Sequence, residues 1–292
     1  MNALRPGQGL PSRLGLLTLL LIPAVTAARE FNAEFAVVMV DDATEKKLGA
    51  FPYDRAEYAK AVDACARLHA KAVVLKFFLD RPRSAAGDAA LAAAMKNIPV
   101  LLQARLEATE GTPQELPARF RYAGGGQPAA AVGGQLGWIP LPLLLDSAAG
   151  VGFVDFDRAE IPLIEEYRHA PFKSLVLGCL ELATGEPAHA TGNGRIELGA
   201  QFMAVDGQNV HHAVLEPMED LKIISFASLL EDRVAPDAIA GRVVIIGWDS
   251  AQTPALAAPR GPMKLHRFFV ECLAATWRAL APTSPPIPPG RP

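Results

Sequence analysis

Short apolar runs alternate with helical patterns between residues 35 and 106, and this alternation limits the fold more than any other feature of the chain. The runs are rich in β-branched residues and contain few polar ones, which is typical of strands buried on both faces. Between them, apolar residues recur at intervals of three and four, which is typical of amphipathic helices. The predicted strands are Phe35–Val40, Ala72–Phe78 and Val100–Leu106, and the predicted helices are Arg55–His69 and Gly87–Lys96. This order predicts a parallel sheet with crossover helices.

The remainder of the chain adds hairpins and further helices to that sheet. Residues Glu107–Pro140 are rich in Gly and Pro and are predicted to form a long loop. Hairpins are predicted for Val151–Phe156 with Ile161–Tyr167, and for Arg195–Val205 with Val210–Val214 around the turn Asp206–Gly207. The other predicted elements are the helices Phe172–Ala183, Ser225–Leu230 and Leu265–Leu280 and the buried strand Val243–Gly247. The predicted class is therefore α/β: a mostly parallel sheet with crossover helices plus additional antiparallel hairpins.

The first 28 residues resemble a secretory signal peptide. Arg5 and Arg13 precede an apolar run, Leu14–Val25, and small residues follow up to Ala28. The run is shorter than the roughly 20 residues that span a bilayer. The alternative is an uncleaved anchor helix that continues towards Phe35. Both readings place the body outside the cytoplasm, periplasmic or secreted, so we expect a signal peptide over 1–28, a domain over 34–281 and a Pro-rich, disordered tail over 282–292.

Composition excludes some classes of function. The net charge of the 292 residues is only -3, and the basic residues are scattered, so we expect no nucleic-acid partner. The three cysteines, Cys65, Cys179 and Cys272, lie in apolar-periodic segments without metal-ligand spacing, so we predict small buried residues rather than a disulfide framework. We expect no cofactor.

Charged residues follow several predicted strands. Asp41 and Asp42 come after the first strand, Lys76 closes the second, Asp249 follows the strand at 243–247, and Arg55 opens the first helix. Ligands of open parallel sheets bind beyond the carboxyl ends of the strands. These five residues are therefore the ligand-binding candidates, although solvated loops at strand ends are also commonly charged.

Signatures of the common enzyme classes are missing. The chain has no Gly-x-Ser-x-Gly elbow, no His-Glu-x-x-His and no P-loop. An acidic pair after the first strand is also found in response-regulator receiver domains, but the Asp and Lys that they need after later strands are missing. Two weaker metal-site patterns can be drawn, although local strand and turn structure explains them better: His211, His212 and Glu216, and Asp155, Asp157 and Glu160. No catalytic or metal-binding residue is predicted.

Five ordered segments of the chain carry distinctive motifs. The first contains an acidic pair, a Gly and then Phe51–Pro52–Tyr53–Asp54–Arg55 before a helix. The others are AKAVVLKFFLDRP with GDAALAAAM, GVGFVDF, ISFASLLEDRVAPDAIAGRVVIIG, and TPALAAPRGPMKLHRFFVECLAA. Together these segments resemble the type 2 CHASE domain, a sensory extracellular module associated with cyclases and histidine kinases. The resemblance covers nearly everything from Phe35 to Leu280.

The resemblance implies a bacterial extracytoplasmic sensory domain rather than an enzyme, with an unidentified small-molecule ligand. Because the chain stops after the closing helix, we expect a stand-alone domain that signals through a membrane-bound partner. Lys76 stands where the family commonly has an acidic residue, and the turn after the Gly-aromatic strand departs from the family pattern. Two alternatives stay open: an exported hydrolase using Asp41, Asp42 and Asp249 around a divalent cation, and a structural envelope protein.

Overall fold

The computed structural model describes residues 30–107, 114–126, 133–156, 158–258 and 261–283. The predicted signal peptide and nearly all of the predicted tail lie outside these residues. No helix within the described ranges is long and apolar enough to cross a bilayer.

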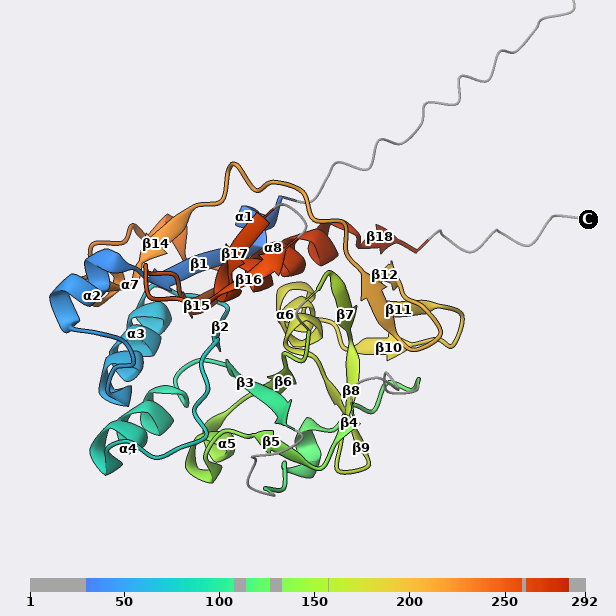
Figure 1. Ribbon diagram of the computed structural model, residues 1–292, viewed down its shortest axis with the longest axis horizontal. Helices are drawn as coiled ribbons and strands as arrows, with labels where there is room; N and C mark the ends of the chain where they lie inside the picture. Colours follow the sequence, from blue (N-terminus) through green and yellow to red (C-terminus); the bar gives the residue numbers. More distant parts are fainter. Residues whose placement is uncertain (1–29, 108–113, 127–132, 157, 259–260, 284–292) are drawn as a thin grey trace, which may run out of the picture.

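A parallel sheet forms the centre of the molecule (Figure 1). Six strands run parallel, and the short strand β5 (Leu136–Trp138) adds antiparallel to the end of β3. In spatial order the six are β14 (Ile223–Ser225), β1 (Phe35–Val40), β15 (Val243–Trp248), β2 (Ala72–Leu75), β3 (Val100–Glu107) and β6 (Gly150–Phe153). The predicted α/β class is confirmed.

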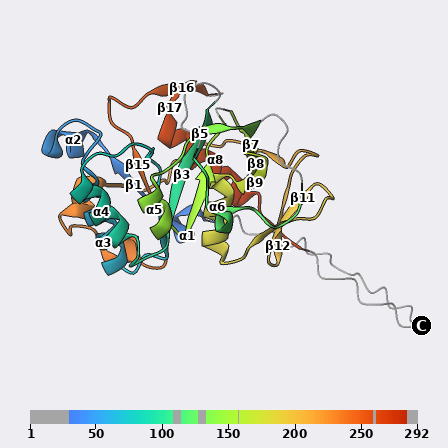
Figure 2. The ribbon, with the colours of Figure 1, turned by 90° about the horizontal axis from the view of Figure 1, so that it is seen from below.

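Helices cover both faces of the sheet, which explains why its strands are apolar throughout. Along β1, Val38 and Val40 pack against the first helical layer, whereas Val37 and Met39 pack against the second. The first layer holds α3 (Arg55–Arg67), α4 (Ala85–Ala94), α5 (Pro142–Ser147) and α7 (Phe226–Leu230). The second holds α1 (Phe31–Glu34), α6 (Leu175–Thr184) and α8 (Leu265–Arg278). Figure 2 shows α3 and α4 on one side of β1 and β3 and α6 and α8 on the other.

Local capping sets where these helices begin. The side chain of Asp54 accepts a hydrogen bond from the Ala56 N–H at the start of α3, and Ser84 accepts one from the Gly87 N–H at the start of α4. Such caps satisfy amide groups that have no partner inside the helix. α2 (Asp42–Leu48) follows β1 directly and lies at the carboxyl edge of the sheet.

Smaller, mostly antiparallel sheets complete the fold; the hairpin of β16 (Ala255–Ala258) and β17 (Gly261–Lys264) lies next to α8, and the others form the end of the molecule away from α3 and α4 (Figure 1). One contains β10 (Ala188–Ala190), β11 (Arg195–Leu198), β12 (Gln201–Ala204) and β18 (Ala281–Pro282). The others pair β7 (Glu160–Pro162) with β13 (Val210–His212), and β8 (Ile164–Tyr167) with β9 (Ala170–Lys173) and β4 (Gly133–Gly134). Two 3-10 turns, η1 (Ala118–Phe120) and η2 (Pro236–Ala238), complete the described elements.

Several predicted pairings in this region are wrong. The predicted hairpin of Val151–Phe156 with Ile161–Tyr167 does not form, because β6 joins the main sheet parallel to β3, β7 pairs with β13, and β8 pairs with β9. Val151 and Phe153 are buried, so β6 belongs to the two-sided core rather than to an exposed hairpin. The hairpin of β11 with β12 forms within Arg195–Val205, but β13 leaves it to pair with β7. The predicted loop Glu107–Pro140 contains β4, β5 and η1.

The three cysteines are free and buried, as predicted. Cys65 lies in α3, Cys179 in α6 and Cys272 in α8, so each fills space between a helix and the sheet.

Candidate functional site

Two adjoining cavities lie at the carboxyl ends of β2 and β3, where the start of α8 crosses the edge of the sheet. Their volumes are about 260 Å³ and about 280 Å³. We call them the polar cavity and the aromatic cavity, and together they form the cleft. Five side chains line both: Lys76, Phe78, Gln103, Leu265 and His266. Binding sites of open parallel sheets occur at this edge, and the cleft is therefore the candidate site.

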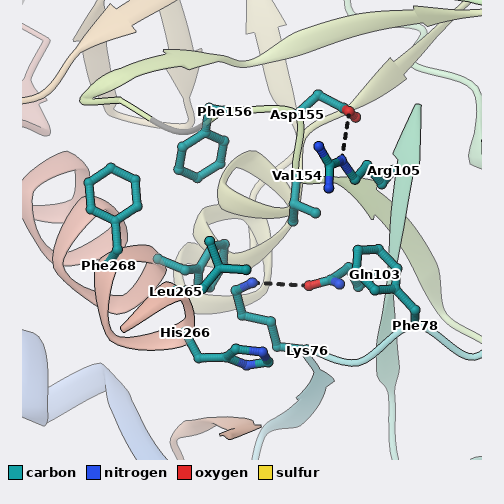
Figure 3. Close-up of a pocket in the computed structure, with 11 residues that line it drawn as sticks. Lys76, Phe78, Gln103, Arg105, Val154, Asp155, Phe156, Leu265, His266 and Phe268 are labelled. Carbon is teal, nitrogen blue, oxygen red and sulfur yellow. Dashed lines mark hydrogen bonds and ion pairs between the residues drawn. The ribbon is translucent and has the colours of Figure 1, made fainter. Parts of the chain in front are cut away.

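Lys76 is the central charged group of the cleft. It follows β2 directly, and only 4% of the residue is exposed. Its ammonium nitrogen donates to Gln103 Oε1 at 3.1 Å and lies 4.8 Å from the centroid of the Phe269 ring. Figure 3 shows the side chain rising from the strand end towards the space between Val154 and Leu265. Gln103 is a neutral partner, so the described contacts of Lys76 provide no countercharge.

Burial makes Lys76 an unusual lysine. Removal of water from the ammonium lowers its pKa from 10.5 to about 7, and the positive charge of Arg105 acts in the same direction. Burial therefore favours the neutral amine more than it is favoured in an exposed lysine. A lysine of this kind titrates readily when its surroundings change.

His266 lies beside Lys76 in the first turn of α8. The backbone N–H of Trp248 donates to its Nδ1 at 3.1 Å, so the neutral ring carries its proton on Nε2. Burial lowers the pKa of His266 well below its usual value, and the nearby charge of Lys76 adds to the shift. The ring is therefore a neutral hydrogen-bond donor that lines both cavities.

Asp155 lines the polar cavity, and the carboxyl group of Glu165 interacts with it without lining the cavity itself. Asp155, just beyond β6, accepts the Leu106 N–H at 2.9 Å and lies 3.8 Å from Arg105 Nε. Figure 3 shows this ion pair above the Lys76 amine. Glu165 is fully buried. Burial and the negative charge of Asp155 raise the pKa of Glu165 well above its usual value, which favours its protonated form.

Aromatic side chains enclose the other cavity. The rings of Phe51 and Trp248 stack with centroids 4.4 Å apart, and those of Tyr58 and Phe77 stack at 4.9 Å. The indole N–H of Trp248 donates to Glu45 Oε1 at 2.9 Å, which fixes its orientation. This cavity is consequently flat-walled and apolar, with Lys76 and His266 along one side.

The acidic pair after β1 makes contacts within the protein. Asp41 Oδ1 accepts from the Thr44 N–H at 2.8 Å and from the Ser225 hydroxyl at 3.0 Å, so it caps α2 and ties it to the end of β14. Asp42 accepts from the Ala251 N–H at 2.6 Å. Asp249 lies 3.0 Å from Lys264 Nζ. Among the five predicted residues, Lys76 and Arg55 line the cleft, whereas these three carboxylates fasten the segments around it.

Arg55 lines the aromatic cavity, but its guanidinium is engaged. It donates to Asp88 Oδ1 at 2.7 Å, and only 3% and 7% of the two side chains are exposed. The Arg81 carbonyl accepts a second hydrogen bond. This buried ion pair joins α3 to α4.

The described residues contain no group of three or more His, Cys, Asp and Glu side chains that could hold a metal ion. His211 Nδ1 lies 3.0 Å from the Ala204 carbonyl, and His212 pairs with Asp206 instead. Asp157, part of the other pattern, lies outside the described residues.

Gln103, His266 and Glu165 were not predicted from the sequence. Each has a charged residue nearby in its own element, Arg105 for Gln103, Arg267 for His266 and Glu166 for Glu165, so no local pattern distinguishes it. The position of His266 beside Lys76 depends on elements that are 190 residues apart in the chain.

Comparison with known proteins gives one family. The sequence model of the CHASE2 domain matches residues 14–280, which is nearly the whole chain. No curated protein and no solved structure matches it. The chain therefore belongs to the CHASE2 family of extracellular sensory domains, as the resemblance of its five segments implied.

Proposed function

We propose that this protein is an exported sensory domain that binds a small molecule in the cleft and signals through a membrane-bound partner. The observation that carries the proposal is the buried Lys76, which has donors to spare and faces a cavity at the edge of the sheet where ligands of such folds bind. Membership of a sensory family supports a binding role rather than a catalytic one.

The volume of the cleft suits a small ligand. Each cavity measures under 300 Å³, which is near the lower end of roughly 300–1,000 Å³ for small-molecule sites. Aromatic walls with a few convergent polar groups are also typical of such sites.

Helix α8 provides a route from the cleft to the other edge of the sheet. Its first turn carries His266, and its last turn carries Trp277, whose ring meets that of Phe35 edge-on at 5.4 Å. Phe35 begins β1, so α8 runs from the carboxyl edge to the amino edge, over about 21 Å. A ligand that moves the first turn of α8 would therefore also displace its last turn and the start of β1 at Phe35.

Two parts of the proposal, export of the domain and signalling through a membrane-bound partner, are supported by the sequence and not by the cleft. The family match begins at residue 14, so it includes the apolar run that precedes the described residues. An N-terminal segment of this kind suits a domain that works outside the cytoplasm. We propose that the ligand-contact residue among the five predicted ones is Lys76, with Arg55, Asp41, Asp42 and Asp249 holding the surrounding segments. The hydrolase alternative gains no support, because each of its three carboxylates has a protein partner.

The proposal can be tested by thermal-shift screening of the full chain against a library of small metabolites. Leu265 lines both cavities and is partly exposed, so Leu265→Trp should fill the cleft without disturbing the core. Leu143 on α5 is similarly exposed, and Leu143→Trp is the matched control. We expect compounds that raise the melting temperature of the wild type and of Leu143→Trp but not of Leu265→Trp. Failure of every compound, or binding that Leu265→Trp leaves unchanged, would overturn the proposal.

A further inference from the structure

The geometry of the cleft points to a chemical class of ligand. We propose that the cleft binds a small carboxylate with a flat apolar body, its carboxylate on the Lys76 ammonium and its body between the rings of the aromatic cavity. The inference rests on the proposed function, because it assumes that the cleft is the ligand site. Its chemistry comes from the side chains that are described above.

The first argument is charge. An ammonium group has three donors, and Lys76 uses one of them on the neutral Gln103. No carboxylate lies within ion-pair distance of Lys76 among the described residues. A buried cation without a countercharge is unfavourable, and a ligand carboxylate would supply that countercharge in a dry site.

The rest of the cleft excludes cationic ligands and favours anionic ones. Its walls include the basic residues Lys76, Arg55, Arg83 and Arg105, whereas Asp155 is the one acidic residue among the described residues that line it. Asp88 neutralises Arg55 from behind the wall. Helix α8 is 14 residues long and begins at the cleft, so the positive end of its dipole acts in the same direction as Lys76.

The second argument is shape. Phe51 and Trp248 stack on one another and, with Tyr58 and Phe77, give the aromatic cavity flat walls. An engineered protein cavity of about 150 Å³ holds one benzene molecule. The aromatic cavity, at about 280 Å³, therefore has room for one ring and a short substituent that reaches Lys76. The Nε2–H of His266 can donate to the second oxygen of the same carboxylate.

Carboxylate binding should be coupled to protonation of Lys76. The ligand stabilises the ammonium form, so binding must take up a proton wherever the free amine is populated. The titratable groups that face Lys76 from the neighbouring elements are Arg105 on β3, Cys179 on α6, His266 and Cys272 on α8, and Asp155 beyond β6. Of these, burial keeps His266 neutral and raises the pKa of both thiols, so Lys76 is the group that takes up the proton near pH 7.

The test is isothermal titration calorimetry of the full chain with benzoate, 4-hydroxybenzoate, phenylacetate and 3-phenylpropionate. Benzyl alcohol and benzylamine are the neutral and cationic comparisons, and inorganic phosphate tests for a non-specific anion site. Lys76→Met keeps the length of the side chain and removes its charge. The exposed Lys60→Met is the matched control. Titrations in two buffers of different ionisation enthalpy measure proton uptake.

We expect at least one carboxylate to bind the wild type and Lys60→Met, while benzyl alcohol and benzylamine bind weakly or not at all. Lys76→Met should bind that carboxylate about 10- to 100-fold more weakly, as expected for loss of a hydrogen bond to a charged group. Because burial lowers the pKa of Lys76, proton uptake on binding should increase between pH 7 and pH 8.5.

Three results would overturn the inference. One is binding of a carboxylate that Lys76→Met leaves unchanged, and another is stronger binding of phosphate or benzylamine than of every carboxylate. The third is that none of the four carboxylates binds with a dissociation constant of about 1 mM or below. If other compounds still bind in a way that Leu265→Trp abolishes, the ligand class is wrong and the proposed function stands. If nothing binds, both fail.

Discussion

Replacement of Arg55 tests whether this predicted site residue holds the fold together rather than a ligand. Its guanidinium lies 2.7 Å from Asp88 Oδ1, and the two side chains are almost fully buried between α3 and α4. Arg55→Ala would leave the Asp88 carboxylate buried with only the Arg83 N–H, at 3.4 Å, as a hydrogen-bond donor. Removal of one partner of a buried ion pair costs about 3–5 kcal/mol of unfolding free energy.

Urea denaturation at 25 °C, followed by circular dichroism, measures this loss as a change in midpoint at constant slope. For a domain of this size, about 3–5 kcal/mol corresponds to a fall in melting temperature of roughly 6–20 °C. The exposed pair Lys60–Glu57 provides the control. Because water screens its charges, Lys60→Ala should cost under about 1 kcal/mol.

The double variant Arg55→Met/Asp88→Leu distinguishes two causes of instability: a buried charge left without its partner, and the loss of the arginine side chain itself. It removes both charges, so it should be more stable than Arg55→Ala, since apolar pairs of similar volume often replace buried ion pairs without loss. The reasoning is refuted if Arg55→Ala is no less stable than Lys60→Ala. It is also refuted if Arg55→Ala loses ligand binding at unchanged stability, because Arg55 would then act on the ligand.

Three further substitutions test the energetics of the cleft and the sheet. Lys76→Met should be more stable than the wild type at pH 7 in urea denaturation. The pKa of Lys76 is lower in the folded than in the unfolded state, so the unfolded state binds more protons between pH 7 and 10.5. The unfolding free energy of the wild type should therefore rise by up to about 1.4 kcal/mol per pH unit over this range. Lys76→Met should not show this dependence on pH. Glu165→Gln should also make the folded protein more stable at neutral pH. Because the pKa of Glu165 is raised in the folded state, the carboxyl group lowers the unfolding free energy as the pH rises above 4.5. If the variant and the wild type show the same dependence of unfolding free energy on pH, this expectation is wrong. Gly152→Ala should cost about 1–3 kcal/mol, because its Cβ would lie 2.4 Å from the Leu175 Cα, and a melting temperature equal to that of the wild type would disprove this close packing.

The four inner strands of the central sheet, β1, β15, β2 and β3, could be predicted because each is an apolar run in the sequence, whereas the short strands β14 and β5 were not predicted. β1 and β15 are buried on both faces along nearly their whole length, so each appears in the sequence as an uninterrupted apolar run. The helices α3, α4, α6, α7 and α8 were predicted to within a few residues, since their apolar faces repeat at the helical period, whereas the short helices α1 and α5 were not predicted. The general location of the site followed from the rule that ligands bind at the carboxyl edge.

The roles of the charged residues at that edge could be predicted only in part. Lys76 lines the cleft, whereas the acidic pair at 41–42 has partners contributed by segments about 180–210 residues away in the chain. Nothing near Arg55 in the sequence indicates that Asp88 will neutralise it. A charged residue at the end of a predicted strand therefore indicates where the edge of the sheet lies. Whether its side chain can bind a ligand depends on the partner that it has in the folded protein.

By itself, the sequence determined the α/β class, the order of the main strands and helices, and membership of a sensory family, because these depend on residues close together in the chain. The tertiary structure decided which strands pair between residues 150 and 214, where several short strands have similar apolar patterns and only packing selects the partner. It also decided the chemical state of Lys76. Its pKa depends on exclusion of water from the ammonium group by surrounding residues, among them Gln103, His266 and Phe269. These residues lie in different elements and come together only in the folded protein.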